Sequence, residues 1–437
     1  MSADEAARKE ELMNRATTCL TVLAGASTNH LLRLWVPGRI EFLGKHTDYA
    51  GGRSLLCAAE RGICLAAMPR RDDQLRVQDA LTGETISESM LLQSSLGAGH
   101  WANYPLTVAR RVVQNFPGTN VGADIAFASD LPRAAGISSS SALVVATFLA
   151  LSAANDLPSR DDYQKAIHNR EDLAGYLGSV ENGGGFGELA GARGVGTFGG
   201  SEDHTAILCG SANALVQYSF CPVRFERSVA LPRGFSFVIA ASGVVAEKSG
   251  AALDLYNGVS LMVSEILERR RSVSGESYSS LAAAVDASPE SAIRIRQMLA
   301  SSAVGSHEAA LRLARFEQFV LESYEIIPMA GDALARGDLA TLGTLVDRSQ
   351  KAAEQMLRNQ IPETVFLARS ARELGAVAAS AFGAGFGGSV WALVADGGTE
   401  SFRTRWSGLY ADHFPAAAAR GEFFVTRAGP RAKVIGG

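Results

Sequence analysis

The segment Pro37–Gly52 reads PGRIEFLGKHTDYAGG, and it is the most informative stretch of this chain of 437 residues. It places an arginine, a histidine and an aspartate among apolar residues and four glycines. Polar side chains enclosed this closely by strand-forming residues are usually held in a site rather than left in solvent. Around them, residues 31–67 alternate apolar runs with turns, so we expect strands and a hairpin to carry the motif.

The order of these residues resembles the sugar-binding motif of the galactokinases, which belong to the GHMP family of sugar, isoprenoid and amino-acid kinases. One position departs from that motif, because galactokinases carry Glu where this chain has Lys45. The resemblance implies that Arg39, Lys45, His46 and Asp48 bind the substrate. It further implies that His46 and Asp48 contact sugar hydroxyls, while Arg39 neutralises charge on the phosphoryl group in transfer.

A second segment, Leu131–Leu143, reads LPRAAGISSSSAL and runs directly into a predicted helix, Ser140–Asn155. Backbone N–H groups at a helix start converge on one point, and the helix dipole favours an anion there. A serine-rich cap of an ordinary helix is the alternative. The segment resembles the GHMP phosphate loop, which implies that ATP phosphates are bound by Gly136, Ser138, Ser139 and Ser140, with Ser140 also a ligand of Mg²⁺.

A third segment, Phe382–Val390, reads FGAGFGGSV. Its glycine spacing matches a dinucleotide-binding fingerprint, but a predicted strand follows it where that fingerprint requires a helix. The segment resembles the third GHMP motif instead, which implies that Gly385 and Gly387 lie close to the phosphates. Many galactokinases carry Arg-Met-Thr in front of this motif, whereas this chain has Ser380-Ala381-Phe382.

A fourth segment, Gly199–Thr205, reads GGSEDHT and resembles the galactokinase segment that supplies the aspartate facing the sugar C1 hydroxyl. The resemblance implies that Asp203 is the catalytic carboxylate, although a loop aspartate can also serve only to accept backbone N–H bonds. Substrate contacts are expected from Gly200 and Tyr256, and His204 is expected to be a structural neighbour. Glu181 is the expected Mg²⁺ carboxylate, with Glu171 as its rival.

Composition narrows the class of protein. The net charge of −4 argues against a diffuse nucleic-acid-binding surface, and the five scattered cysteines show no metal-ligand spacing. Their number and scatter indicate reduced thiols in a cytoplasmic protein. No apolar run approaches the roughly 20 residues that span a bilayer, so we expect no membrane partner. The expected assembly is a monomer or a weak homodimer.

Predicted elements mix helices and strands without strict alternation, which indicates an α+β protein. The resemblance implies the two-domain GHMP kinase fold: a ribosomal protein S5 domain 2-like N-terminal domain, a ferredoxin-like C-terminal domain and an active site in the cleft between them. We place the domains at 1–232 and 233–437. Other predicted elements bear on later findings: a helix over 161–177, a hairpin over 207–220 and 223–229, a long loop over 182–200 and a last strand over 423–434.

The resemblance implies an ATP- and Mg²⁺-dependent sugar 1-kinase that phosphorylates the anomeric hydroxyl of galactose or a related hexose. Replacing Glu by Lys45 favours a hydrogen-bond acceptor or an anion near C6, so a uronic-acid 1-kinase is an alternative. Lys45 can equally point to solvent or pair with Glu41, in which case the substrate is galactose. A non-catalytic sugar sensor that keeps the kinase fold is a second alternative.

Overall fold

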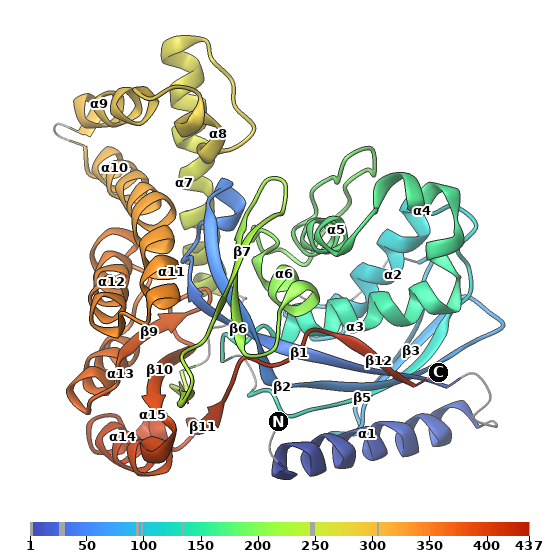
Figure 1. Ribbon diagram of the computed structural model, residues 1–437. Helices are drawn as coiled ribbons and strands as arrows, with labels where there is room; N and C mark the ends of the chain where they lie inside the picture. Colours follow the sequence, from blue (N-terminus) through green and yellow to red (C-terminus); the bar gives the residue numbers. More distant parts are fainter. Residues whose placement is uncertain are drawn as a thin grey trace.

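The computed structural model describes residues 3–25, 31–92, 96–97, 99–132, 135–244, 250–303 and 306–436. Arg133 and Ala134 of the serine-rich segment lie outside these residues. Two β-sheets and the helices packed on them form the molecule, and a column of helices rises beside the first sheet (Figure 1). The α+β class expected from the sequence is confirmed.

The first sheet has eight strands and is built around two long ones, β1 (Leu32–Leu43) and β2 (Arg53–Pro69). Along its main path the order is β12-β1-β2-β5-β3-β4, and β6 and β7 extend the other half of β2. All pairs are antiparallel except β3 with β5. The remaining strands are β3 (Gln74–Asp79), β4 (Thr85–Ser89), β5 (Ala123–Ser129), β6 (Ala214–Ser219), β7 (Arg224–Ala230) and β12 (Lys433–Gly436).

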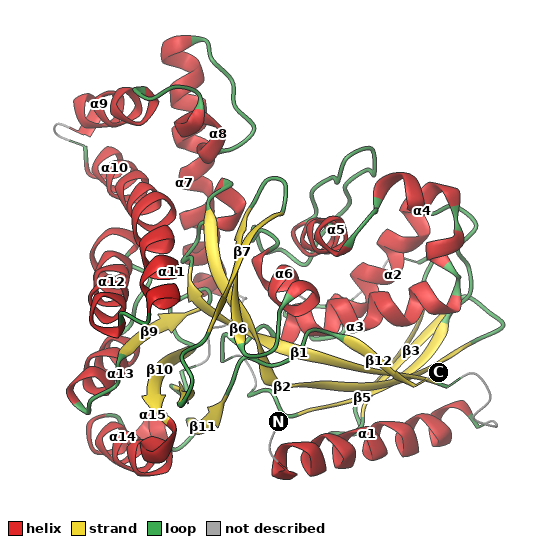
Figure 2. Ribbon diagram, viewed as in Figure 1, coloured by secondary structure: helices red, strands yellow, loops and turns green. Residues whose placement is uncertain are grey.

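Helices cover both faces of this sheet, which explains why β1 and β2 read as nearly continuous apolar runs. Helix α1 (Ala3–Ala24) packs Leu12, Ala16 and Leu20 against one face (Figure 2). The apolar α3 (Ser139–Ala154) lies on the other face and is buried along most of its length. Three further helices accompany α3: α2 (Asn103–Asn115), α5 (Arg170–Asn182) and α6 (Glu202–Cys209).

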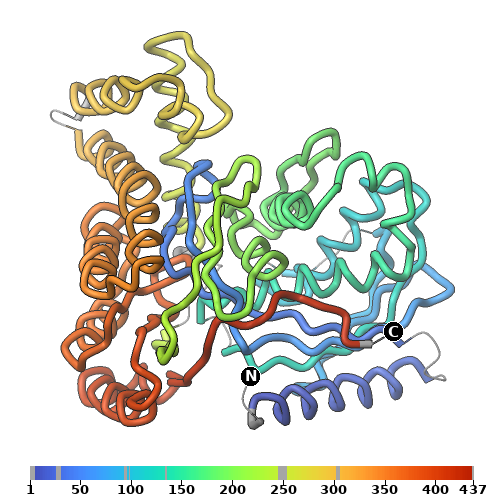
Figure 3. The backbone as a smooth tube through the Cα atoms, viewed as in Figure 1, coloured from blue at the N-terminus to red at the C-terminus, as the bar shows by residue number. Residues whose placement is uncertain are grey.

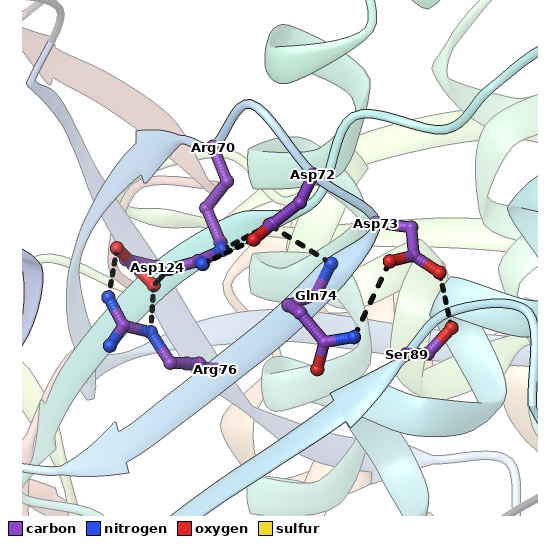
Figure 4. A network of polar contacts seen from close by, with 7 residues as sticks. All are labelled: Arg70, Asp72, Asp73, Gln74, Arg76, Ser89 and Asp124. Carbon is purple, nitrogen blue, oxygen red and sulfur yellow. Dashed lines mark hydrogen bonds and ion pairs between the residues drawn. The ribbon is translucent and has the colours of Figure 1, made fainter.

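A polar network fixes the end of the first sheet where β5 and β3 run parallel (Figure 4). Asp124 on β5 is 5% exposed, and it accepts bonds from Arg70 at 2.8 Å and from Arg76 at 2.5 and 2.6 Å. Arg70 also binds Asp72. A buried carboxylate needs paired cations, so Asp124 holds the chain just after β2 and the strand β3 in one register.

The second sheet has four antiparallel strands in the order β11-β8-β10-β9. They are β8 (Phe235–Ala241), β9 (Ala378–Phe382), β10 (Ser389–Ala395) and β11 (Glu422–Thr426). The helices α12 (Leu339–Ala352), α13 (Pro362–Glu373), α14 (Thr399–His413) and the short α15 (Pro415–Ala418) pack around it. The column of helices consists of α7 (Gly250–Ser274), α8 (Leu281–Asp286), α9 (Ser291–Ala303), α10 (His307–Val320) and α11 (Ile327–Arg336).

The two sheets meet through aromatic side chains. Trp391 on β10 is fully buried, stacks on Phe42 of β1 with ring centroids 4.3 Å apart, and donates from Nε1 to the backbone oxygen of Glu41 at 3.2 Å. Phe237 of β8 completes the cluster. After β11 the chain returns from the second sheet to the first, where β12 pairs with β1 at the edge (Figure 3). The second half of the chain therefore contributes a strand to the first sheet, beyond the expected division at residue 232.

Three predicted elements are corrected by the structure. The helix expected over 161–177 is broken into α4 (Asp161–Ala166) and α5, because Asn169 caps α5 by accepting the N–H of Asp172. The strand expected from residue 207 is helical up to Cys209, and β6 begins at Ala214. The single last strand expected over 423–434 is two strands, β11 and β12, in different sheets.

The Trp391 contact gives a test of how strongly the sheets depend on each other. We expect Trp391→Ala to lower the free energy of unfolding by about 3–5 kcal/mol, as truncation of a buried tryptophan typically does. Urea denaturation measures the change. Leu261→Ala, at a side chain on α7 that is 47% exposed, is the matched control and should change little. Equal stability of the two variants would contradict a shared core at Trp391.

Candidate active site

A cavity of about 550 Å³ brings together segments that are far apart in the sequence. Most of the residues expected in the site line it: Arg39, His46, Asp48, Gly136, Ser138, Ser139, Ser140, Glu181, Gly200, Asp203 and Tyr256. Lys45, Gly385 and Gly387 are not among its lining residues. The cavity is therefore built from β1, the turn after it, the start of α3, the end of α5, the start of α6 and the loop after β9.

Arg39 and Asp203 form an ion pair in the wall of this cavity. Arg39 Nε donates to Asp203 Oδ1 at 2.7 Å, and Arg39 Nη1 donates to the backbone oxygen of Gly136 at 2.5 Å. Burial lowers the pKa of Arg39, but the carboxylates of Asp203, Glu41 and Glu202 outweigh this and raise it above its usual value. The guanidinium is thus a fixed cation that orients Asp203 against the serine-rich loop.

The start of α3 carries the serine-rich segment into the cavity. Ser138 adopts a left-handed conformation with φ 58°, which turns the chain sharply into the helix. Its hydroxyl is buried and has no hydrogen-bond partner among the described residues. The first N–H groups of a helix have no partner within the helix. Together with the helix dipole they give the start of α3 a positive potential beside Arg39.

Ser141, which sequence reasoning did not select, links two carboxylates. Its Oγ lies 2.8 Å from Glu181 Oε2 and 3.3 Å from Asp203 Oδ2. His204 Nε2 lies 3.2 Å from the same Glu181 oxygen. The rival carboxylate, Glu171, lies elsewhere: it accepts a bond from Tyr218 at 3.1 Å and lines a separate surface hollow. Glu181 is the one of the two that reaches the cavity.

The turn after β1 presents His46 and Asp48. His46 has φ 57° and is fastened at both ring nitrogens, to Tyr49 at 2.9 Å and to the backbone oxygen of Ala384 at 3.0 Å. Its ring centroid lies 5.6 Å from that of Tyr256. Asp48 accepts the N–H of Glu202 at 3.1 Å, and burial raises its pKa. A side chain at Gly200 would collide with Asp48, which explains the glycine there.

Lys45 points away from the cavity, contrary to the expectation that it contacts the sugar. Its side chain is 1% exposed, and Nζ donates to Ser380 at 2.7 Å and to Ser349 at 3.3 Å. Ser349 in turn donates to Glu322 at 2.9 Å. Glu41 attracts the same ammonium. Lys45 is therefore held in a buried network that connects the Pro37–Gly52 segment to the second half of the chain. The predicted pairing with Glu41 is one part of this network.

Of the two glycines expected beside the phosphates, neither lines the cavity, and Gly385 packs behind its wall. A Cβ on Gly385 would approach Asn359 to 2.3 Å, so this glycine allows close packing behind the cavity wall. The residues of this loop that do line the cavity are Gly383 and Ala384. Gly136 fits beneath them, since a Cβ there would lie 3.3 Å from the backbone oxygen of Phe382. The second and third motifs thus meet backbone to backbone.

Sequence reasoning missed several residues of the cavity wall. Glu41 and Glu202 are buried carboxyls, and burial raises the pKa of Glu41 to about 7 and that of Glu202 well above its usual value. At another part of the wall, Trp101 and Tyr104 add aromatic surface. Trp101 and Tyr104 stand close together in the sequence, which is a signal of an aromatic surface, whereas nothing in the sequence brings Glu41 and Glu202 together.

The chain is similar to known kinases in three segments and over most of its length. Residues 33–69 match the model of the galactokinase galactose-binding signature, residues 103–186 that of the GHMP kinases N terminal domain, and residues 332–411 that of the GHMP kinases C terminal. A galactokinase of Roseiflexus sp. (strain RS-1) is 30% identical over 404 residues, covering 90% of each chain. The chain belongs to the GHMP kinase family.

This GHMP kinase is a galactokinase-like phosphotransferase, and members of its family use ATP. A galactokinase of Exiguobacterium sibiricum is 26% identical over 425 residues, covering 94% of this chain and 95% of the relative. The fold agrees with a crystal structure of Lactococcus lactis galactokinase complexed with galactose: the TM-score is 0.75 at 20% identity, over 94% of this chain and 97% of the other. The expected two-domain kinase fold is confirmed. No helix within the described residues is long and apolar enough to cross a membrane.

The buried network predicts that Lys45 contributes to stability. We expect Lys45→Met to lower the free energy of unfolding by about 3 kcal/mol, because removing one member of a buried ionic network leaves its partners uncompensated. Lys351→Met, at an exposed lysine on α12, is the matched control. Urea denaturation measures both variants. A loss below about 1 kcal/mol, the value of an exposed pair, would show that Lys45 is not held as described.

We expect the buried His46 to make the free energy of unfolding depend on pH. Burial lowers its pKa from 6.5 to about 4, so between these values the unfolded chain binds a proton that the folded chain does not. His46 therefore makes stability rise with pH across this window, by at most about 1.4 kcal/mol for each pH unit. We expect His46→Gln to flatten the slope there, as measured by urea denaturation at several pH values. Parallel profiles for wild type and variant would refute a buried neutral His46.

Proposed function

We propose that this galactokinase-like sugar kinase transfers the terminal phosphoryl group of ATP to the anomeric hydroxyl of galactose or a related hexose. One observation carries the proposal: Asp203, paired with Arg39, lies beside the start of α3 in a single cavity. Phosphoryl transfer needs positioning and charge neutralisation more than covalent chemistry. A carboxylate, a fixed cation and a helix start within one cavity provide both.

For ATP, the binding elements are the start of α3 and the aromatic wall. The N–H groups after Ser138 donate hydrogen bonds to the phosphates, and the buried hydroxyl of Ser138 adds a donor. Trp101 and Tyr104 offer apolar surface for the base. The start of α3 is the positive end of the helix dipole, and no lysine is among the described residues that line the cavity.

A magnesium site fits the oxygen donors at the end of α5. Ser141 Oγ joins the carboxylates of Glu181 and Asp203, and Ser140 lines the same wall. Mg²⁺ prefers oxygen ligands and is usually bound through one or two carboxylates together with substrate phosphates, so this small donor set suffices. Glu181 and a serine hydroxyl would hold the ion, whose charge would offset that of the phosphates.

Asp203 accepts the proton of the sugar hydroxyl while the hydroxyl oxygen forms a bond to the terminal phosphorus of ATP and ADP leaves. Arg39 keeps Asp203 ionised and in place, and its guanidinium lies between the carboxylate and the phosphate loop. Asp48 lies on the adjoining wall, where it accepts hydrogen bonds from sugar hydroxyls. His46 lines the same wall, but both of its ring nitrogens are bound within the protein, so its predicted contact with a sugar hydroxyl requires one of these bonds to be exchanged. The anomeric hydroxyl is the acceptor expected for an aspartate so placed in a galactokinase-like kinase.

The two alternatives receive less support. A uronic-acid kinase would need Lys45 to face the substrate, but its ammonium is held by Ser349 and Ser380 outside the cavity wall. A non-catalytic sensor would not require the paired Arg39 and Asp203. Sugar-dependent release of ADP separates turnover from mere binding.

The activity is tested by Asp203→Asn, which keeps the shape of the side chain and removes its basicity. We expect the turnover number for hexose phosphorylation to fall by about 10²–10⁴-fold, the usual contribution of general base catalysis. Release of ADP from ATP and Mg²⁺ is measured with galactose and related hexoses. Asp161→Asn, at an exposed residue of α4, is the matched control. Undiminished turnover in Asp203→Asn, or no sugar-dependent turnover in wild type, would reject the proposal.

A further inference from the structure

Two carboxyl groups of the cavity wall have no task in the proposed transfer. Glu41, on β1, is 3% exposed, and Glu202, at the first residue of α6, is 5% exposed. Both line the cavity that holds Arg39 and Asp203. Burying a carboxyl group costs several kcal/mol unless it is paired, so two of them in one wall call for a ligand or a partner.

Glu41 is only partly satisfied by the protein. Its Oε2 accepts the N–H of Gly383 at 3.1 Å, whereas Oε1 is buried and has no hydrogen-bond partner among the described residues. A buried acceptor without a donor destabilises the folded protein. Since Glu41 and Gly383 both line the cavity, a donor on the bound molecule is the natural partner for this oxygen.

Glu202 adds negative charge to the same wall. One of its oxygens accepts the hydroxyl of Ser54 at 2.7 Å, and its backbone N–H is bound to Asp48. Glu41 and Asp48 both raise the pKa of Glu202 through repulsion, after the larger effect of burial. The carboxyl groups of Glu41, Asp48 and Glu202 are thus close enough to act on one another.

Arg39 and Lys45 attract Glu41 through their charges, but their hydrogen bonds go to other groups. Arg39 is paired with Asp203, and Lys45 with Ser349 and Ser380. Arg315 donates to Gln318 and to the backbone oxygen of His46. Of these three, only Arg39 lines the cavity. Acidic groups, Glu322 behind the wall included, outnumber these cations.

Resting on the proposed hexose kinase activity, we propose that Glu41 and Glu202 make the sugar end of the cavity selective for hydrogen-bond donors, so that amino hexoses are preferred to neutral hexoses and hexuronates are excluded. An ammonium group offers three donors and a positive charge, a hydroxyl offers one donor, and a carboxylate offers none. Burial raises the pKa of Glu41 to about 7, so the sugars are compared above pH 7, where Glu41 is ionised. A carboxylate placed against Glu41 then also meets like-charge repulsion. This inference reverses the specificity that Lys45 suggests when the sequence is considered alone.

The experiment compares four sugars that differ in one substituent: galactosamine, 6-amino-6-deoxygalactose, galactose and galacturonate. Values of kcat/KM come from ADP release, and affinities for the nucleotide-free protein come from calorimetry. For wild type we expect at least one of the two amino sugars to have a higher kcat/KM and a higher affinity than galactose. Its kcat/KM should exceed that of galacturonate by at least about 100-fold, because a carboxylate placed against the wall meets like-charge repulsion. Galacturonate equal to or better than the amino sugars would overturn the inference.

Variants assign the preference to the wall. We expect Glu41→Gln or Glu202→Gln to reduce the ratio of amino sugar to galacturonate at least about fivefold, a typical effect of losing a charged hydrogen bond. Glu60→Gln is the matched control: Glu60 is also buried, at 8% exposed, but does not line the cavity, so the ratio should stay as in wild type. A reduction smaller than fivefold in both wall variants would overturn the inference.

The two readouts distinguish the two proposals. Turnover without the expected ranking would reject the inference and leave the hexose kinase in place. Binding with the expected ranking but without turnover would reject the kinase activity and keep the donor-selective wall. Absence of binding by all four sugars would reject the wall as well. Should a wall variant fail to fold, the ranking measured by calorimetry on wild type still decides.

Discussion

Charged side chains are buried where the two sheets meet, and each must find a partner there, because an unpaired buried charge costs more than the fold can spare. β1 brings Arg39 and Glu41 into this region, and the turn after it brings Lys45. Their partners come from every other part of the chain, including Asp203, Gly383 and Ser380. The pairing therefore determines how the second half of the chain is seated on the first sheet, and with it the shape of the cavity.

Each of the first three sequence motifs also holds one residue with a side chain in the left-handed region, with φ between 56° and 58°: His46, Ser138 and Phe386. Such residues cost free energy and persist where their surroundings fix them, often at functional sites. His46 is fixed by bonds to Tyr49 and Ala384. Glycine would adopt these turns more easily, so the side chains of His46 and Ser138 are kept for what they present to the cavity.

The resemblance of the motifs to those of GHMP kinases predicted which segments meet, and Arg39, the serine-rich segment and Asp203 do line one cavity. The sequence could not predict the direction of Lys45, since a side chain's course at the end of a strand depends on partners roughly 300 residues away, Ser349 and Ser380. The same holds for Glu41, whose place in the cavity wall depends on the loop that supplies the N–H of Gly383. The break before α5, by contrast, was readable from the capping Asn169.

Glu181 shows how helix geometry selects among carboxylates. Glu171 and Glu181 lie on the same helix, α5, but about 15 Å apart along its axis. Glu181 occupies the last turn, where the helix dipole disfavours a negative charge. It is held there by Ser141 from the start of α3, where the dipole has the opposite sign. A carboxylate at the unfavourable end of one helix, bonded to the start of another, would gain stability from the cation that the proposed phosphoryl transfer calls for.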